Sequence, residues 1–219
     1  MNITEDTTVY LVHYWPGSCG AFIAHLINSL IAGKDTIKNI SANGNVHDSA
    51  ILTETNNYHV IHNHGINHPE ELYKTHTKRK SIVIQVYEKD LPLVHANFFY
   101  KAVTDSYHTS DWLQDHWNFY KDVYFDGIKD PRLATPEMVI RYINGDLWPV
   151  DDIKKFAVDV EISPEFYLIN FRDIYLDKDK IIKQLCEITG TSTNINTLKM
   201  YDKYLEQQHI QEKINFIWR

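Results

Sequence analysis

The residues best placed to do chemistry in this 219-residue chain form a loop of small side chains near the N-terminus. The loop consists of Pro16, Gly17, Ser18, Cys19, Gly20, Ala21 and Phe22. It follows a strand-length apolar run, Thr8–Trp15, and precedes apolar residues at helical spacing that end near Gly33. The first turn of a helix has unpaired N–H groups and the positive end of the helix dipole. We therefore predict that residues 16–22 bind a phosphate or sulfate group. The alternative is an ordinary turn in which small residues only relieve crowding.

A histidine cluster offers a second chemistry, metal binding. It contains His59, His62, His64 and His68. His62 and His64 are two residues apart, so on a strand they share a face, as a metal-binding pair would. His13 or Glu88 would be the third ligand. A metal site normally shows a fuller set of ligands with supporting carboxylates, so we expect no metal.

Cys19 raises a third possibility, a cysteine nucleophile. A thiol at a helix N-terminus has a lowered pKa, and a histidine from a neighbouring strand would accept its proton. The phosphatase pattern, in which an Arg follows the Cys after five residues, is absent because position 25 is His25. The simpler interpretation is that Cys19 is a small residue filling a tight turn.

The surrounding elements predict how these residues are positioned. Further strands are expected at Tyr58–His64, Ser81–Tyr87 and Phe166–Phe171, and Lys34–Asn57 reads as a loop. Helices are expected at residues 69–76, 88–107, 110–125, 135–144, 178–189 and 194–218, with Asp90 and Asp177 as N-caps and Gly190 as a C-cap.

Strands separated by helices indicate a single α/β domain over residues 1–219, with a parallel sheet flanked by helices. The ligand of such a sheet lies beyond the carboxyl ends of the strands. We therefore expect Pro16–Phe22, His62–His64 and Tyr87–Asp90 to surround one crevice.

Four segments of the chain together resemble the sulfotransferase family, which has a P-loop-type α/β fold. Residues 16–22 occupy the place of the family's sulfate-binding loop, and His62-Asn63-His64 matches its second-strand element. Residues 86–95 occupy the region of its Arg-and-Ser donor element, and Phe166–Gly190 follows its late strand, loop and helix.

The resemblance implies a donor, 3′-phosphoadenosine 5′-phosphosulfate, and a small-molecule or carbohydrate acceptor with a hydroxyl or amine. It places His64 at the position of the catalytic base, with Glu88 as a second candidate. His62, when protonated, would replace a missing cation. Loop residues 17–22, with the Ser18 hydroxyl, would hold the phosphate and sulfuryl oxygens.

The chain departs from the family pattern within the donor site. The loop Lys is Gly17, and the strand Arg and helical Ser appear as Val86 or Tyr87 and His95. His95 or Asn97 would then contact the 3′-phosphate. A non-catalytic protein that binds an anion, nucleotide or sugar on the same fold therefore stays open, as does a metal-dependent hydrolase using the histidine cluster. In the binding protein, the region of Trp112, Trp117 and Tyr120 would be a stacking surface, although aromatics at helical spacing are more often core.

The composition of the chain limits which classes of partner and which compartment we expect. The formal net charge of −7 argues against nucleic acid and anionic membranes as partners. No apolar run reaches transmembrane length, and residues 1–8 do not read as a signal peptide. Two cysteines, Cys19 and Cys186, do not make a disulfide framework, so we expect a cytoplasmic protein.

Overall fold

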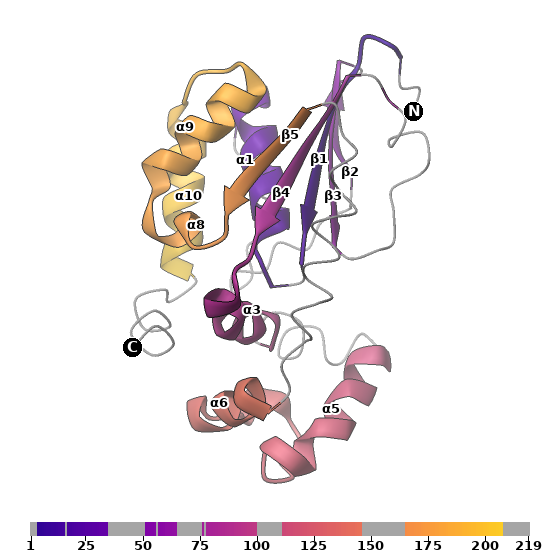
Figure 1. The fold of residues 1–219 in the computed structure, drawn as a ribbon, viewed down its shortest axis with the longest axis vertical. Helices are drawn as coiled ribbons and strands as arrows, with labels where there is room; N and C mark the ends of the chain where they lie inside the picture. The colour runs from indigo at the N-terminus through magenta and orange to yellow at the C-terminus, as the bar shows by residue number, and fades with distance from the viewer. Residues whose placement is uncertain are drawn as a thin grey trace.

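The computed structural model describes residues 4–15, 17–34, 51–55, 57–64, 76, 78–99, 111–145 and 165–207. Within these ranges the chain forms a five-stranded sheet with the order β2-β3-β1-β4-β5 (Figure 1). The strands are β1 (Thr8–Tyr14), β2 (Ile51–Thr55), β3 (Tyr58–His64), β4 (Arg79–Gln85) and β5 (Glu165–Asn170). Four of them are parallel, and only β2 runs antiparallel to its neighbour β3. The predicted parallel α/β fold is confirmed.

The central strand β1 is buried on both faces. Tyr10 and Val12 belong to the main core, whereas Val9 and Leu11 form a second small cluster with Ile61. Successive side chains of a strand point to opposite faces, so these two sets cover the two sides of the sheet. Burial on both sides explains why β1 reads as an almost continuous apolar run.

One face of the sheet carries the helices α1 (Gly20–Ala32), α8 (Asp173–Leu176), α9 (Lys178–Thr189) and α10 (Ile195–Gln207) (Figure 1). Phe22 of α1 stacks on Tyr204 of α10, with ring centroids 3.6 Å apart, and meets Tyr201 edge-on. The main core therefore lies between β1, β3, β4 and this helical layer.

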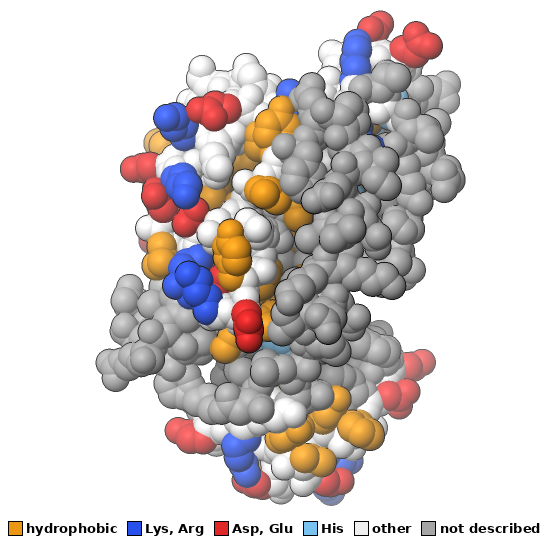
Figure 2. Space-filling model, viewed as in Figure 1, with side chains coloured by type: hydrophobic (Ala, Val, Ile, Leu, Met, Phe, Trp, Pro, Cys, Tyr) orange, Lys and Arg blue, Asp and Glu red, His pale blue; other side chains and the backbone are white. Residues whose placement is uncertain are grey.

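A second group of helices lies beyond the carboxyl ends of the strands (Figure 1). It contains η1 (Glu88–Asp90), α3 (Leu91–Phe98), α5 (Asp111–Tyr124), η4 (Pro131–Leu133) and α6 (Pro136–Gly145). Trp117, Phe125 and Tyr142 make up much of a separate hydrophobic cluster around the end of α3. Leu93 and Val94 of α3 pack in the main core, so α3 joins the two clusters. Figure 2 shows exposed hydrophobic side chains at the α5–α6 end, where Phe119 and Leu133 lie.

The structure confirms two predicted helix caps and corrects one predicted loop. The caps Asp177 and Gly190 are confirmed, since Asp177 accepts a hydrogen bond from the Lys180 N–H and Gly190 is left-handed. The loop predicted for Lys34–Asn57 is wrong at Ile51–Thr55, which forms β2. Its remaining residues, apart from Lys34 and Asn57, lie outside the described ranges. Residues 208–218 of the last predicted helix and all but His76 of the helix at 69–76 also lie outside them. None of the described helices has the length and apolar character needed to span a bilayer.

Candidate anion site at the β1–α1 loop

The loop between β1 and α1 leaves the central strand at its carboxyl end. On one side β1 pairs with β3, and on the other side it pairs with β4. The chain moves from β1 to the β3 side, whereas β4 is followed in the sheet by β5. The crevice between β1 and β4 is therefore the switch point at which open α/β sheets bind ligands.

The backbone of this loop is sharply turned. The Ser18 N–H and the Ser18 hydroxyl both donate to the Trp15 carbonyl, at 2.9 and 2.6 Å. Gly17 has a φ of 89° and Cys19 a φ of 68°. Gly17 adopts this region at no steric cost, whereas a side chain such as that of Cys19 costs about 1–2 kcal/mol there. Both hydrogen-bond donors of Ser18 are used within the turn, so the structure does not support the predicted role of the Ser18 hydroxyl in holding the ligand. The N–H groups of the following residues are the remaining donors.

Four such N–H groups lie at the start of α1. The first helical bond runs from the Ile23 N–H to the Cys19 carbonyl, at 3.1 Å. In the described part of the chain, no acceptor is found for the N–H groups of residues 19–22. The N-cap residue Cys19 makes no capping bond, and the first turn has no acidic side chain. In this part of the structure, the positive end of the α1 dipole therefore has no acidic or capping partner, which makes it a candidate site for an anion.

A buried polar network fixes the loop to two other helices. Asn97 of α3 donates from Nδ2 to the Gly17 carbonyl at 3.1 Å and to the Tyr175 hydroxyl at 2.7 Å. The Tyr175 hydroxyl of α8 lies 2.8 Å from Sγ of Cys19. Burial, with a further contribution from Cys19, raises the pKa of both Tyr175 and Tyr204 well above the ordinary value. Both hydroxyls therefore stay protonated and available as donors.

This network bears on the cysteine-nucleophile hypothesis. Cys19 is buried, with 5% of its surface exposed, and its partners are the hydroxyls of Tyr175 and Tyr204. Within the described residues no histidine accepts a hydrogen bond from the thiol. The contacts therefore favour the simpler interpretation, in which Cys19 fills the turn and anchors it.

Tyr14 connects the loop to β3. Its hydroxyl lies 3.0 Å from Nδ1 of His62, and burial raises its pKa, with a smaller contribution from Cys19. A Tyr14 hydroxyl that donates to Nδ1 leaves the hydrogen of a neutral His62 on Nε2. In that tautomer His62 offers a donor rather than a base. Gly20 makes this geometry possible, because a Cβ there would overlap the Tyr14 ring.

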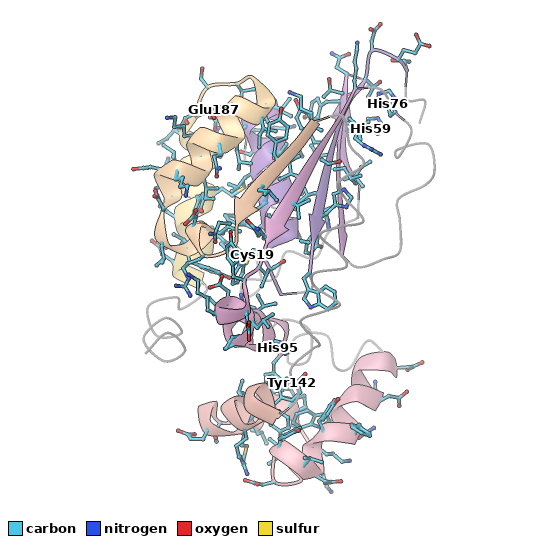
Figure 3. The ribbon with its side chains drawn as sticks, in the orientation of Figure 1. Cys19, His59, His76, His95, Tyr142 and Glu187 are labelled. Atoms are coloured by element: carbon cyan, nitrogen blue, oxygen red, sulfur yellow. The ribbon has the colours of Figure 1, made fainter. Side chains whose placement is uncertain are left out.

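His64 is the last residue of β3, and its backbone is paired with Tyr14 beside the loop. Its side chain lies outside the described part of the structure. Of the other predicted members of the histidine cluster, His68 lies outside the described residues. His59 lies near His76 at the opposite end of the sheet from Cys19 (Figure 3). Among the described residues, no group of three His, Cys, Asp or Glu side chains is arranged to hold a metal.

At the carboxyl end of β4 lies an open cavity of about 590 Å³, lined by Tyr87, Glu88 and Lys89. Tyr87 is 42% exposed, and Nζ of Lys89 lies 6.0 Å from the centre of its ring. His95, predicted to contact the donor, is fully buried on α3 (Figure 3). The cavity thus combines an aromatic face with a cation that the sequence interpretation did not select.

Asp90 occupies the N-cap position of α3, but its carboxylate has another role. It makes no capping bond, and Oδ1 accepts from Nε and Nη2 of Arg172 at 2.9 and 2.7 Å. Asp90 is fully buried and Arg172 is 27% exposed. This ion pair ties the end of β4 to the turn after β5, next to the cavity.

The aromatic residues of α5 form part of the interior. Trp117 is 1% exposed and packs on Phe125, with centroids 4.8 Å apart, and Tyr120 stacks on Tyr124. The Trp112 side chain lies outside the described residues. Trp117 is therefore core and offers no stacking surface.

Sequence reasoning selected the loop, His62 and the range Tyr87–Asp90, but it missed Tyr175, Tyr204 and Arg172. Tyr175 and Arg172 lie in the Phe166–Gly190 segment that carried much of the resemblance, although nothing in their spacing indicated a role. Lys89 lies within the range Tyr87–Asp90 that was expected at the crevice, but sequence reasoning gave it no role of its own.

Comparison with known proteins gives no match: no family model, no curated protein and no solved structure is detectably similar to this chain.

Proposed function

We propose that this protein transfers a sulfuryl group from 3′-phosphoadenosine 5′-phosphosulfate to the hydroxyl or amine of a small-molecule or carbohydrate acceptor, as the sulfotransferases it resembles do. The observation that carries the proposal is the set of N–H groups at residues 19–22. They lie at the carboxyl end of the central strand, where the dipole of α1 and four donors favour a phosphate or sulfate group.

The residues present fit a phosphosulfate group in part. The open N–H groups supply donors for its oxygens, and no acidic side chain in the first turn of α1 opposes them. The loop Lys of the family is replaced by Gly17, whose carbonyl is held by Asn97. At the end of β4, Lys89 would take the place of the missing Arg and hold the 3′-phosphate, with Tyr87 beside it.

The donor, when bound, would supply the sulfuryl group: the acceptor oxygen or nitrogen bonds to sulfur as the bond between sulfur and the bridging phosphate oxygen breaks, and 3′-phosphoadenosine 5′-phosphate leaves. Under this proposal His64 takes the proton of the acceptor hydroxyl or amine, because β3 ends there beside the loop. The hydrogen bond from Tyr14 to Nδ1 of His62 keeps the His62 hydrogen on Nε2, which then donates to an oxygen of the ligand. The N–H groups of α1 stabilise the charge that develops on the phosphate and sulfuryl oxygens. Burial of Tyr14 keeps the Tyr14 donor protonated.

The test is a transfer assay with the donor and a set of hydroxyl and amine acceptors, comparing wild type with His64→Ala. The proposal predicts turnover in wild type and at least a hundredfold lower kcat in His64→Ala, with donor affinity retained. His76→Gln is the matched control, because Nε2 of His76 donates to the Thr7 carbonyl at the other end of the sheet. Turnover that survives in His64→Ala would remove His64 from the mechanism.

A second candidate function is non-catalytic binding of an anion or nucleotide at the same loop. The specific observation in its favour is that His95, at the position of the family's donor-binding Ser, is fully buried. This candidate predicts nucleotide binding without turnover of any acceptor.

A further inference from the structure

The helix α5 has a solvent-facing side that carries both acidic and apolar residues, here called the outer face of α5. Its five members lie within about 120° of one another around the helix axis, at about 100° per residue: Asp111, Asp115, Phe119, Asp122 and Val123. Phe119 is 71% exposed and Val123 is 61% exposed, and the three aspartates are exposed as well. Figure 2 shows acidic and hydrophobic side chains on the surface at this end of the molecule.

The opposite side of α5 forms its hydrophobic cluster without the two apolar residues of the outer face. Trp117 is buried there and packs on Phe125, and neither Phe119 nor Val123 belongs to that cluster. Phe119 and Val123 are four residues apart, so they are neighbours on the helix surface. They therefore present a contiguous apolar surface to solvent, of the kind that marks an interaction site.

The three aspartates of the outer face leave a local negative charge. In the part of the chain that the structure describes, none of their carboxylates has a Lys, Arg or His partner. The next two aspartates along the chain differ, because Asp126 pairs with Arg141 at 2.9 Å and Asp130 pairs with Arg132 at 2.6 Å. A cationic partner would neutralise the charge that remains on the outer face.

The helix itself gains little from these aspartates. Asp111 and Asp115 are four residues apart, a spacing at which like charges repel each other. Asp122 lies in the last turn of α5 (Asp111–Tyr124), where the negative end of the helix dipole disfavours a carboxylate. Residues that oppose local stability without a compensating contact in the fold point to a role outside it.

The charge of the outer face determines which kind of molecule fits it. A second copy of this chain, docked face to face around a two-fold axis, would bring two acidic surfaces together. An anionic bilayer would be repelled by the same carboxylates. Charge complementarity instead selects a partner with Lys or Arg beside apolar side chains, and an amphipathic helix presents this combination.

We propose that the outer face of α5 binds a basic amphipathic helix of another protein. Apolar side chains of that helix cover Phe119 and Val123, and its Lys or Arg side chains pair with the three aspartates. The outer face shares no residue with the β1–α1 loop or with the cavity at Tyr87, so this proposal does not depend on the proposed function.

The test is fluorescence anisotropy of a labelled synthetic peptide of about 18 residues, or five helical turns, titrated with the full chain. The peptide has Leu on one helical face and Lys on the other. We expect wild type to bind it with a Kd of about 100 μM or tighter. Phe119→Ser should weaken binding at least about tenfold. Asp115→Asn combined with Asp122→Asn should weaken it at least about threefold, and high salt should weaken it in wild type.

Matched controls come from the helical layer on the sheet. Ile195→Ser removes an apolar side chain that is 61% exposed on α10. Glu187→Gln combined with Glu206→Gln removes two exposed charges, and Glu187 lies on α9 at the other end of the molecule from α5 (Figure 3). These control proteins should bind the peptide as wild type does. A loss of binding in them as large as in the outer-face variants would overturn the proposal.

A second peptide, with Glu in place of every Lys, decides the proposal without any variant. Wild type should not bind it detectably. Equal binding of the two peptides, or no binding of the Lys peptide, would overturn the proposal. Self-association of the chain that is lost in Phe119→Ser would assign the outer face to a second copy, and binding to phosphatidylserine vesicles that is lost in the same variant would assign it to lipid. Either result would also overturn the proposal.

Discussion

Cys19 and Cys186 differ in how accessible their thiols are. This difference tests whether Cys19 is a reactive nucleophile or a small residue that fills the turn. Cys19 is 5% exposed and contacts the Tyr175 hydroxyl, whereas Cys186 is half-buried on α9. Because alkylation needs access to the thiol, we predict that iodoacetamide modifies Cys186 at least tenfold faster than Cys19 in the folded protein. Peptide mass spectrometry over a time course measures both rates. Faster labelling of Cys19 would favour the nucleophile hypothesis instead.

His59 makes stability depend on pH. Burial lowers its pKa, with smaller contributions from the N-terminal amine and His76. The folded state therefore binds fewer protons than the unfolded state below the unfolded pKa of about 6.5. The contribution of neutral, buried His59 to the free energy of unfolding is fully present above that pH. It is lost as pH falls through the pKa of His59 in the folded state. Between the unfolded and the folded pKa of His59, each pH unit lowers the free energy of unfolding by up to about 1.4 kcal/mol.

Urea unfolding between pH 8 and pH 5 tests this prediction. The free energy of unfolding should fall toward pH 5 in wild type, and it should fall less steeply in His59→Asn. Equal slopes for the two proteins would show that His59 is not responsible.

At the scale of elements, the contact between β1 and α1 depends on Gly20. A Cβ at this position would overlap the Tyr14 ring, which carries the hydrogen bond to His62. We predict that Gly20→Ala lowers the free energy of unfolding by about 1–3 kcal/mol and weakens anion binding, because Tyr14 must move. Gly33→Asn is the control: Gly33 has a φ of 70° with no atom near its Cβ position, a conformation that Asn tolerates. Equal stability of Gly20→Ala and wild type would contradict the packing described here.

The ion pair of Asp90 and Arg172 joins the ends of β4 and β5. Arg172→Gln leaves a fully buried carboxylate without its cation, so we predict a loss of about 3 kcal/mol in unfolding free energy. Asp90→Asn combined with Arg172→Gln should recover part of this loss. Arg141→Gln, which breaks an exposed pair with Asp126, should change stability little. Denaturant titration of the four proteins gives the comparison, and a loss below about 1 kcal/mol in Arg172→Gln would show that solvent screens Asp90.

The sequence predicts the strands well because hydrophobic periodicity reports burial directly. β3 was predicted with its observed bounds, Tyr58–His64. β2 was missed because Ile51–Thr55 is short, lies in a polar segment and gains its strand partners only by pairing with β3. The loop of the site was predictable from its small residues between a strand and a helix. The partners that fix it, Asn97 and Tyr175, come from α3 and α8, and only tertiary packing brings them to the loop.

At the scale of the whole molecule, the sheet order places the carboxyl ends of the parallel strands β3, β1 and β4 side by side at one edge of the sheet. The N–H groups of α1, the end of β3 at His64 and the cavity at Tyr87 and Lys89 lie along this edge. Under the proposed function, such an arrangement would provide an anion site, a base and a cavity lined by Tyr87, Glu88 and Lys89 around one switch point. The central claim is that this edge binds the nucleotide of the sulfuryl donor.

Calorimetric titration of the full chain with 3′-phosphoadenosine 5′-phosphate, beside plain adenosine 5′-phosphate, tests that claim most directly. We predict that the first nucleotide binds, and that it binds at least tenfold more tightly than the second because Lys89 pairs with the 3′-phosphate. Lys89→Gln should remove the difference, whereas Lys78→Gln, which alters an exposed pair with Asp6 at the amino ends of β4 and β1, should not. If neither nucleotide binds, the proposed function is contradicted, whereas the assignment of the fold is unaffected.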